Sequence, residues 1–514
     1  MRHNRHCGVL LHPTSLPSKY GIGELGYEAH RFIDFLEQSG MSIWQVLPLG
    51  PTGYGDSPYS SFSTFAGNPL LISLDNLVGY EDLSMIDLAD RPDFPEDRID
   101  YGKVIEWKIP KLRLAAENFL SHKNKQTRHE AYKHFCKSKK KWLDDFALFM
   151  ALKEHFQAKA QSEGVDGAIW SNYWDEDIAL RDPLAIKKWK SELKSEIEIQ
   201  KVWQFFFFCQ WMDLKGYANL KGIQIIGDIP IFVAPDSADV WAHRDIFCLD
   251  EKGSPSVVAG VPPDYFSATG QRWGNPLYDW DKMKSTGFKW WIERIEATLE
   301  LVDIIRVDHF RGFEAYWEIP AEEKTAVKGR WVKALGKDLF TKVRSKLGVL
   351  PILAEDLGEI TEEVIELRDF FGFPGMNVLQ FAFEGSASDP DGQNPFLPHN
   401  HNPNAVVYTG SHDNDTTRGW YDKACEADRD HVKSYFVCND MDVVWAFVRA
   451  AIASVCQYAI IPMQDLLNLE SDCRMNLPGK LGGNWGWRMY EDHMHHELAG
   501  SIRYLVQLYG RLPE

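Results

Sequence analysis

The strongest constraint on the fold is a series of eight short apolar runs, each followed by a polar, glycine or proline turn. The runs are mostly continuous rather than alternating, which is typical of strands buried on both faces of a parallel sheet. They are Gly8–Leu11, Ile43–Leu47, Gln224–Gly227, Val302–Val307, Ile352–Ala354, Asn377–Phe381, Ala405–Tyr408 and Ala459–Pro462. Most intervals between them carry apolar residues at helical spacing, as in Thr361–Phe371, where Thr361 is placed to cap a helix and Gly372 to end it.

Strands that alternate with helices in this way predict an α/β fold, a (β/α)8 TIM barrel. A doubly wound parallel sheet is the alternative. We expect one catalytic barrel over residues 1–514, with a large, mostly helical subdomain inserted at 50–200, because the interval between the second and third strands is far too long for one crossover. Further insertions are expected at the C-terminal rim, at 229–285 over the active site and at 382–404 as a rim loop.

Charge and composition exclude several classes of partner. The formal net charge of −18 makes nucleic acid an unlikely ligand, because its phosphates bind clustered lysine and arginine. No run approaches the roughly 18 consecutive apolar residues of a membrane span, and the basic start Met1–Cys7 is too short for a signal peptide. The cysteines are scattered without a C-x-x-C pair, which indicates reduced thiols. We therefore expect a cytoplasmic protein without nucleic-acid or membrane partners, as a monomer or small homo-oligomer.

Four of the predicted strands are followed by an acidic residue at the end that faces the catalytic rim of a barrel. These residues are Asp228, Asp308, Glu355 and Asp413. A single carboxylate there could merely cap a helix, but convergence on one rim suits either a metal site or acid–base and nucleophilic work on a sugar. His309 and His412 are the candidate ligands in the metal alternative. The prediction is that the protein uses no metal and no other cofactor.

Asp308 and Glu355 belong to neighbouring strands. Adjacent strands lie about 4.8 Å apart, and glycoside cleavage with retention needs two carboxyl groups about 5–5.5 Å apart. Arg306 lies two residues before Asp308 and on the same side of the strand, where its charge would keep Asp308 ionised as a nucleophile. Crowding by Asp308 and Asp413 should raise the pKa of Glu355 and keep it protonated as the acid. A structural ion pair between Arg306 and Asp308 is the alternative.

Several long motifs occur in a fixed order along the chain. They are Gly8–Pro17, Trp44–Thr52, Gly53–Tyr59, Val258–Ser267, Trp273–Tyr278, Gln464–Leu466 and Arg474–Asn476. In this length and order they resemble the motifs of glycoside hydrolase family 77, the amylomaltases or disproportionating enzymes of the α-amylase clan. The resemblance implies a 4-α-glucanotransferase that moves α-1,4-glucan segments between maltooligosaccharides through a covalent glycosyl-enzyme. An α-glucan hydrolase on the same barrel is the alternative, whereas an inactive glucan-binding protein would be expected to lack one of the carboxylates.

The resemblance also implies roles for individual residues. Asp308 matches the family's nucleophile, Glu355 its general acid/base, and Asp413 the third carboxylate, which holds the hydroxyls of the distorted sugar. The substrate-binding positions are Ser57, Tyr59, Asp228, Tyr265, Phe266, Trp273, Asn275, Arg306 and His412. Among them, Tyr265, Phe266 and Trp273 match acceptor-side and lid positions.

The resemblance leads to separate predictions for three further positions. Tyr59 would stack on a sugar ring, with an ordinary core tyrosine as the alternative. Asn476 matches a structural stretch near the last barrel strand and receives no catalytic role. Ser411 stands where the family commonly has threonine, and the hydroxyl group is retained.

Overall fold

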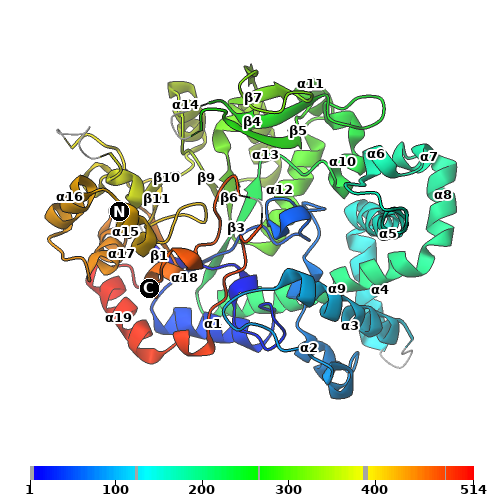
Figure 1. Cartoon of the computed structure of the whole chain (residues 1–514), viewed down its shortest axis with the longest axis horizontal. Helices are drawn as coiled ribbons and strands as arrows, with labels where there is room; N and C mark the ends of the chain where they lie inside the picture. The colour runs from blue at the N-terminus through cyan, green and yellow to red at the C-terminus, as the bar shows by residue number, and fades with distance from the viewer. Residues whose placement is uncertain (1–4, 122–125, 264–266, 386–391, 481, 514) are drawn as a thin grey trace.

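The computed structural model describes residues 5–121, 126–263, 267–385, 392–480 and 482–513 (Figure 1). Its centre is an eight-stranded parallel sheet in the order β10-β11-β12-β1-β2-β3-β6-β9. The strands are β1 (His6–Leu10), β2 (Ile43–Gln45), β3 (Gln224–Pro230), β6 (Ile304–Asp308), β9 (Ile352–Ala354), β10 (Gly375–Val378), β11 (Ala405–Tyr408) and β12 (Tyr458–Pro462). A 2.9 Å backbone hydrogen bond from Ala354 N to Pro374 O links the two ends of the order. The predicted (β/α)8 barrel is therefore confirmed.

All eight predicted strands are present, but some of their bounds were wrong. The run Asn377–Phe381 was expected to be one strand, yet β10 ends at Val378, its last residue paired with β11. Leu379–Ala382 turns into a 3-10 helix while Leu379 stays buried, so the apolar run outlasts the ladder. In contrast, β6 continues to Asp308, one residue beyond the predicted end, so Asp308 is itself a strand residue.

The inside of the barrel is filled by one cluster of buried apolar side chains. Each strand contributes at least one of them: Leu10, Ile43, Ile226, Ile304, Leu353, Met376, Val406 and Ile460. Layers of side chains, mostly branched, fill the interior of a parallel eight-stranded barrel. The barrel is thus a solid core below the rim, and its chemistry must lie at the strand ends.

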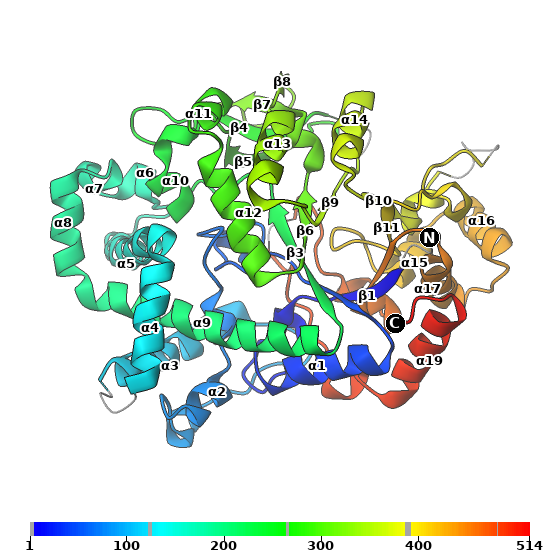
Figure 2. The same ribbon diagram turned by 180° about the vertical axis from the view of Figure 1, so that it is seen from behind.

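Helices surround the sheet, as the two opposite views show (Figures 1 and 2). Those in the barrel wall are α1 (Tyr27–Gln38), α9 (Lys194–Leu220), α12 (Lys289–Leu301), α13 (Gly336–Leu347), α14 (Glu362–Phe371), α17 (Val443–Ala453) and α19 (His496–Leu508). As predicted, α14 ends at Gly372, which adopts a left-handed φ of 71°. Thr361 occupies the N-cap position, but its side chain makes no capping hydrogen bond. No helix in the described part of the chain combines the length and apolar character needed to cross a membrane.

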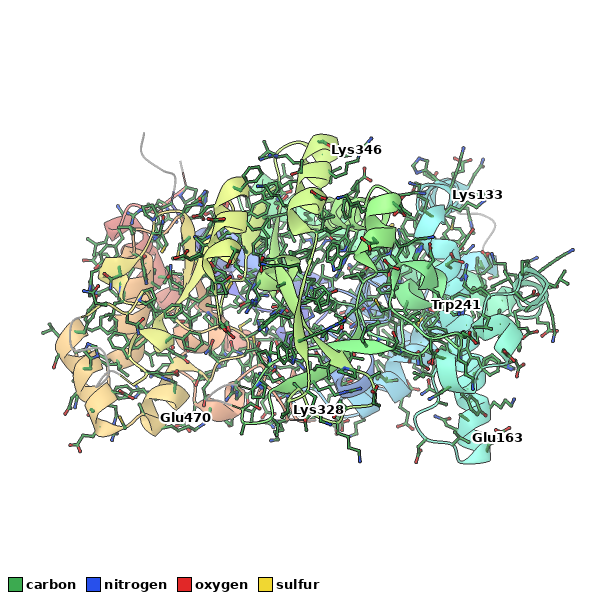
Figure 3. The ribbon with its side chains drawn as sticks, turned by 90° about the horizontal axis from the view of Figure 1, so that it is seen from above. Lys133, Glu163, Trp241, Lys328, Lys346 and Glu470 are labelled. Carbon is green, nitrogen blue, oxygen red and sulfur yellow. The ribbon has the colours of Figure 1, made fainter. Side chains whose placement is uncertain are left out.

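The long interval between β2 and β3 is helical. It holds α2 (Leu74–Gly79), α3 (Tyr101–Ser121), α4 (Gln126–Ser138), α5 (Lys140–Glu163), α6 (Trp170–Tyr173), α7 (Glu176–Ala179) and α8 (Pro183–Glu192) before the start of α9. Lys133 and Glu163 lie toward one end of the molecule and Glu470 toward the other (Figure 3). The expected boundary at residue 200 falls inside α9, so the division of the chain into subdomains stays a prediction.

A second sheet lies above the barrel rim and was not anticipated. Its strands are β4 (Val257–Val261), β5 (Gln271–Pro276), β7 (Ala315–Pro320) and β8 (Arg330–Lys333), in the antiparallel order β5-β4-β7-β8. The remaining helices are α10 (Ala238–Ala242), α11 (Trp280–Ser285), α15 (Thr417–Lys423), α16 (Glu426–Phe436) and α18 (Met463–Leu466). Through β5 the sheet carries Trp273, whose ring packs edge-on against His309 with centroids 4.8 Å apart.

One buried arginine near the C-terminus ties the bottom of the barrel together. Arg511 is only 1% exposed and donates to the carbonyl oxygens of His6, Ile452, Ser454 and Cys456 at 2.6–3.0 Å. Replacing it by methionine leaves several buried carbonyls without a donor. We expect Arg511→Met to lower the free energy of unfolding by roughly 2–4 kcal/mol, measured by chemical denaturation.

The matched control is Arg503→Met on α19, since Arg503 is exposed and makes only 3.4 Å hydrogen bonds. This change should alter stability by no more than about 0.5 kcal/mol. Equal stability of both variants would show that water replaces the Arg511 contacts.

Candidate active site

Four strand ends bring the predicted acidic residues to one rim. In the ladder between β3 and β6, Asp228 pairs with Arg306 and Pro230 with Asp308. Beyond the ladder between β6 and β9, Glu355 N donates to Val307 O at 3.0 Å, and Phe310 N donates to Glu355 O at 2.9 Å. Asp308 and Glu355 therefore stand at the ends of adjacent strands.

Arg306 forms ion pairs with two carboxylates of different exposure. Its Nη1 atom lies 2.6 Å from Asp228 Oδ2 and 3.0 Å from Asp308 Oδ1. The Asp228 side chain is fully buried, whereas that of Asp308 is 27% exposed. Burial opposes the charge of Arg306, but the two aspartates outweigh it and raise the pKa of Arg306 well above its usual value. The structural ion pair is thus made with Asp228, and the same cation attracts negative charge on Asp308.

Glu355 is held by backbone donors on both sides. Its Oε2 accepts from His309 N at 2.7 Å and its Oε1 from Leu357 N at 2.9 Å. His309 has a left-handed φ of 51°, rare for a residue other than glycine. Burial and then the charge of Asp308 raise the pKa of Glu355 to about 7, against the opposing effect of Arg306. The predicted direction is confirmed, but burial is the main cause and Asp413 is not among the principal ones.

Asp413 lies on the loop after β11. Its Oδ2 is 3.3 Å from His412 Nε2, and its Oδ1 accepts from Asn476 Nδ2 at 2.7 Å. Desolvation opposes ionisation, but His412, Asn476 and Arg306 outweigh it and hold the pKa of Asp413 below its usual range. Asp413 raises the pKa of His412 in turn, although burial of the imidazole opposes this. The pair therefore favours an anionic carboxylate beside a cationic imidazole.

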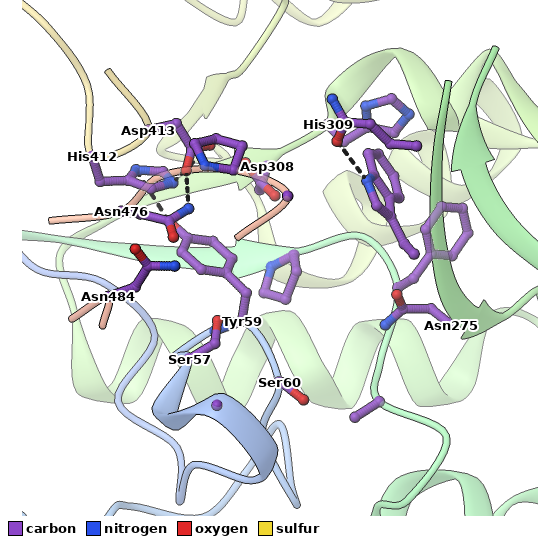
Figure 4. A pocket seen from close by; sticks show the side chains of 18 of the residues that line it. Ser57, Tyr59, Ser60, Asn275, Asp308, His309, His412, Asp413, Asn476 and Asn484 are labelled. Carbon is purple, nitrogen blue, oxygen red and sulfur yellow. Dashed lines mark hydrogen bonds and ion pairs between the residues drawn. The ribbon is translucent and has the colours of Figure 1, made fainter. Parts of the chain in front are cut away.

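A cavity of about 420 Å³ adjoins these groups (Figure 4). The predicted site residues that line it are Ser57, Tyr59, Trp273, Asn275, Asp308, His412 and Asp413. Asp228, Arg306 and Glu355 are not among the residues that line it, and Glu355 is bonded to the backbone of His309, which does line it. Tyr265 and Phe266 lie outside the described residues. The cavity thus joins side chains from the barrel rim, the 57–59 segment and β5.

Tyr59 is fixed by polar and aromatic neighbours. Its hydroxyl donates to Asp228 Oδ2 at 2.9 Å, and its ring stacks on His412 with centroids 4.9 Å apart. The ring also lies 5.9 Å from that of Trp485. Stacking of Tyr59 on a sugar stays a prediction, because one part of its surface is already covered by the imidazole.

Comparison with known proteins supplies the family. The sequence profile of glycoside hydrolase family 77, described as 4-alpha-glucanotransferase, matches residues 11–493. The chain belongs to this family. It is 51% identical over 518 residues to the 4-alpha-glucanotransferase of Synechocystis sp., covering 99% of each protein. It is 50% identical over 518 residues to the 4-alpha-glucanotransferase of Thermus thermophilus, again covering 99% of each.

Solved structures agree with this assignment. The amylomaltase of Streptococcus agalactiae in complex with acarbose has a TM-score of 0.93 and 39% identity, covering 99% of this chain and 100% of that one. The amylomaltase of Corynebacterium glutamicum has a TM-score of 0.75 at 18% identity, covering 99% of this chain and 74% of that one, which shows the fold. The chain is therefore an enzyme of the 4-α-glucanotransferase family on a (β/α)8 barrel.

Two residues of this family-77 site were missed or undervalued from the sequence. Asn476 was placed in a structural stretch without a catalytic role, yet it lines the cavity and donates a hydrogen bond to Asp413. His309 was considered only as a metal ligand, yet its backbone holds Glu355 and its ring packs against Trp273. Its position directly after Asp308 was the available signal for His309, whereas Asn476 lies 63 residues from its partner.

The two histidines of the rim, His309 and His412, contact other side chains and do not form part of a group of metal ligands. His412 contacts Asp413 and Tyr59, and burial lowers the pKa of His309 to about 4, so its ring is neutral. Over the described parts of the chain, no group of three or more His, Cys, Asp or Glu side chains is arranged to hold a metal ion.

The raised pKa of Glu355 predicts a limb in the pH–rate profile of this glucanotransferase. The sequence predicts Glu355 as the general acid, which must be protonated to act. On that prediction, kcat/KM for transfer should fall as the pH rises through about 7. His309 does not contribute in this range, because its pKa is near 4. The measurement is the initial rate of maltooligosaccharide transfer from about pH 5 to pH 9.

His412 is another titratable group of the site, and its pKa is raised by Asp413 against the opposing effect of burial. A maltosyl fluoride donor separates the two, because fluoride leaves without protonation. If loss of the Glu355 proton causes the fall of kcat/KM with rising pH, that fall should be smaller with the fluoride donor. A fall of the same size would mean that His412 causes it instead.

Proposed function

We propose that this chain transfers α-1,4-glucan segments from a donor to the 4-hydroxyl of an acceptor glucan or glucose, with retention, through a covalent glycosyl-enzyme on Asp308. One pairing carries the proposal. Asp308 lines the cavity 3.0 Å from the buried Arg306, and Glu355 at the end of the next strand has a pKa raised to about 7. The first carboxyl group is suited to nucleophilic attack and the second to proton donation.

The proposed reaction has two displacements. In the first, an Asp308 carboxylate oxygen attacks the anomeric carbon, the glycosidic bond breaks, and Glu355 gives its proton to the leaving oxygen. In the second, Glu355 takes the proton of an acceptor 4-hydroxyl, whose oxygen displaces Asp308 from the same carbon. Two inversions restore the original configuration, and no metal is needed to balance either step.

The other site residues would bind the sugars. Asp413, held by His412 and Asn476, is suited to accept hydroxyl groups of the ring that is being distorted. Ser57, Asn275 and the 39% exposed Trp273 would contact further rings, with Trp273 on the acceptor side. The family resemblance adds Tyr265 and Phe266 as acceptor-side and lid residues. Maltooligosaccharides as substrates and a cytoplasmic location are parts of the same proposal.

The relatives' names support transfer, and the acarbose complex of the Streptococcus agalactiae amylomaltase supports an oligosaccharide in the cavity. Transfer in place of hydrolysis requires that an acceptor be bound and water be excluded. The β5 strand, which carries Trp273 and Asn275 at the cavity wall, is suited to that task.

Incubation with maltotriose alone tests the proposal. Transfer produces glucose together with a ladder of longer maltooligosaccharides, resolved by chromatography. Glucose and maltose without any ladder would identify an α-glucan hydrolase, and unchanged maltotriose would remove the proposed substrate class.

A further inference from the structure

Two segments far apart in the sequence meet at the backbone of Asp413. Arg474 Nη2 donates to Asp413 O at 2.9 Å, and Arg474 Nε donates to Asn476 O at 2.8 Å. Asn476 Nδ2 then returns to Asp413 Oδ1 at 2.7 Å. One guanidinium thus fixes the main chain of both the residue that bears the carboxylate and the residue that orients it. Figure 4 shows Asn476, Asp413 and His412 side by side at the cavity.

Arg474 is itself anchored away from the cavity. Its Nη1 lies 3.6 Å from Asp415 Oδ2, which also contacts Lys423 Nζ at 2.6 Å and Ser471 Oγ at 2.7 Å. Gly419 allows this packing, because a Cβ there would lie 2.1 Å from Ser471 Oγ. The network joins α15 to the segment after β12, so it can hold the two loops in a fixed relation.

The carboxylate of Asp413 is faced by groups from several elements. His412 on its own loop lies 3.3 Å from Oδ2, and Asn476 contacts Oδ1. The positive charge of Arg306 on β6 stabilises the Asp413 carboxylate, and Tyr59 from the 57–59 segment also lies within electrostatic range of Asp413. Asn476 is the one neutral donor among the groups that contact the two carboxylate oxygens in the described chain, so a change there alters orientation without removing a cation.

We propose that Arg474 and Asn476 are positioning residues for the transfer reaction, and that they act as one unit to fix the orientation of the Asp413 carboxylate toward the sugar. Arg474 holds the two loops at a fixed distance through its hydrogen bonds to both backbones. At this distance the Asn476 side chain can donate its hydrogen bond to Asp413 Oδ1. This inference rests on the proposed function, because it assigns Asp413 to the substrate. Neither residue is assigned contact with the reacting atoms.

The first experiment compares Asn476→Asp with Asn476→Ala. The aspartate would place a second carboxylate at hydrogen-bond distance from Asp413 Oδ1, so the two groups must share a proton. The acid limb of the profile, where kcat/KM falls as the pH is lowered and the carboxylates gain protons, should therefore move up by about one pH unit or more in Asn476→Asp. In Asn476→Ala, kcat should fall about ten-fold or more, with KM changed less than about three-fold and the acid limb moved less. Equal losses in both variants, with no movement of the limb, would overturn the proposal.

The second experiment is a double-mutant cycle. Arg474→Met should lower kcat about ten-fold or more, and the double variant Arg474→Met/Asn476→Ala should lose little beyond the larger single loss, because both changes remove one unit. If the fold-losses in kcat of the two single variants multiply in the double variant, the residues act independently, and the proposal that they form one unit is wrong. Arg474→Lys should recover less than half of the loss, since an ammonium group cannot bridge both carbonyls in the planar geometry. Full recovery by lysine would show that charge, not bridging, is what matters.

Arg418 provides the matched control. It donates to the carbonyls of Asp440 and Met441 at 3.0 and 3.4 Å, and so also joins two segments, but it does not contact Asp413. Arg418→Met should lower the thermal midpoint and leave kcat and the acid limb unchanged, whereas an effect equal to that of Arg474→Met would reduce the latter to general stability. The wild-type arm of the maltotriose assay is run in parallel. A missing ladder there would defeat the proposed function, and a normal ladder with unaffected variants would defeat this inference alone.

Discussion

Asp308→Asn should abolish glucan transfer, with kcat lowered by about 10⁴-fold or more. The substitution preserves the shape of the side chain but removes the negative charge that we propose attacks the anomeric carbon. Arg306 keeps its 2.6 Å ion pair with Asp228, so the rim should stay folded and the thermal midpoint should change little. The measurement is the initial rate of maltotriose disproportionation, together with a thermal melt of the same preparation.

Asp303→Asn is the matched control at the opposite end of β6. Asp303 pairs with Lys215 at 3.3 Å and accepts from Ile225 N at 2.8 Å, so its role is structural. Residues at the N-terminal face of such barrels serve stability, whereas the C-terminal rim carries the chemistry. Asp303→Asn should therefore lower the thermal midpoint and keep kcat near wild type. Near wild-type activity in Asp308→Asn would show that the nucleophile is another group.

The contrast between these two aspartates also shows what the sequence could predict. The barrel follows from apolar runs that are buried on both faces, and the rim follows from the polar residues just after them. Asp308 and Arg306 could be placed on one side of a strand because side chains alternate along it. Their 3.0 Å contact confirms that reasoning.

Other features depend on packing that no local pattern records. The strands β4, β5, β7 and β8 were not predicted. β5 and β8 are largely polar and exposed, so they carry no continuous apolar run. β4 does carry one, but only its ladders with β5 and β7 identify it as a strand. The true end of β10 at Val378 is set by where its ladder with β11 stops, not by the hydrophobicity of Leu379. The apolar pattern therefore predicts where an element lies, but the residues at which it begins and ends are set by the strands and helices that pack against it.

The site has the same division between local and non-local information. Glu355 could be chosen from its strand, but its two backbone donors depend on the left-handed φ of His309, which a non-glycine residue rarely adopts. Asn476 could not be connected with Asp413, because two loops separated by α15, α16, α17, β12 and α18 must first be brought together. Candidates for the catalytic groups could therefore be proposed from the chain, whereas the groups that orient them become visible only in the fold.

Glu355→Gln should separate bond cleavage from leaving-group protonation. The amide cannot donate an acidic proton, so transfer from maltotriose should slow by about 10²–10⁴-fold. Maltosyl fluoride needs no such proton, and its first displacement should slow far less, by less than about ten-fold. One backbone donor, His309 N or Leu357 N, must then face the amide NH₂ group, at a cost of about 1–3 kcal/mol in stability.

The decisive readout is the fate of the enzyme after fluoride has left. Without Glu355 as the base, the acceptor hydroxyl is not activated, so a maltosyl ester should accumulate and be found by mass spectrometry on the peptide that contains Asp308. Glu359→Gln, an exposed glutamate on the same loop, should accumulate no ester and keep wild-type rates with both donors. Equal slowing of the two donors in Glu355→Gln would remove Glu355 as the acid, and an ester on any other residue would relocate the nucleophile. Both displacements occur at the same anomeric carbon. Trapping the ester on Asp308 in Glu355→Gln would therefore show that Asp308 attacks this carbon and that Glu355 acts on the oxygens that leave it and enter it.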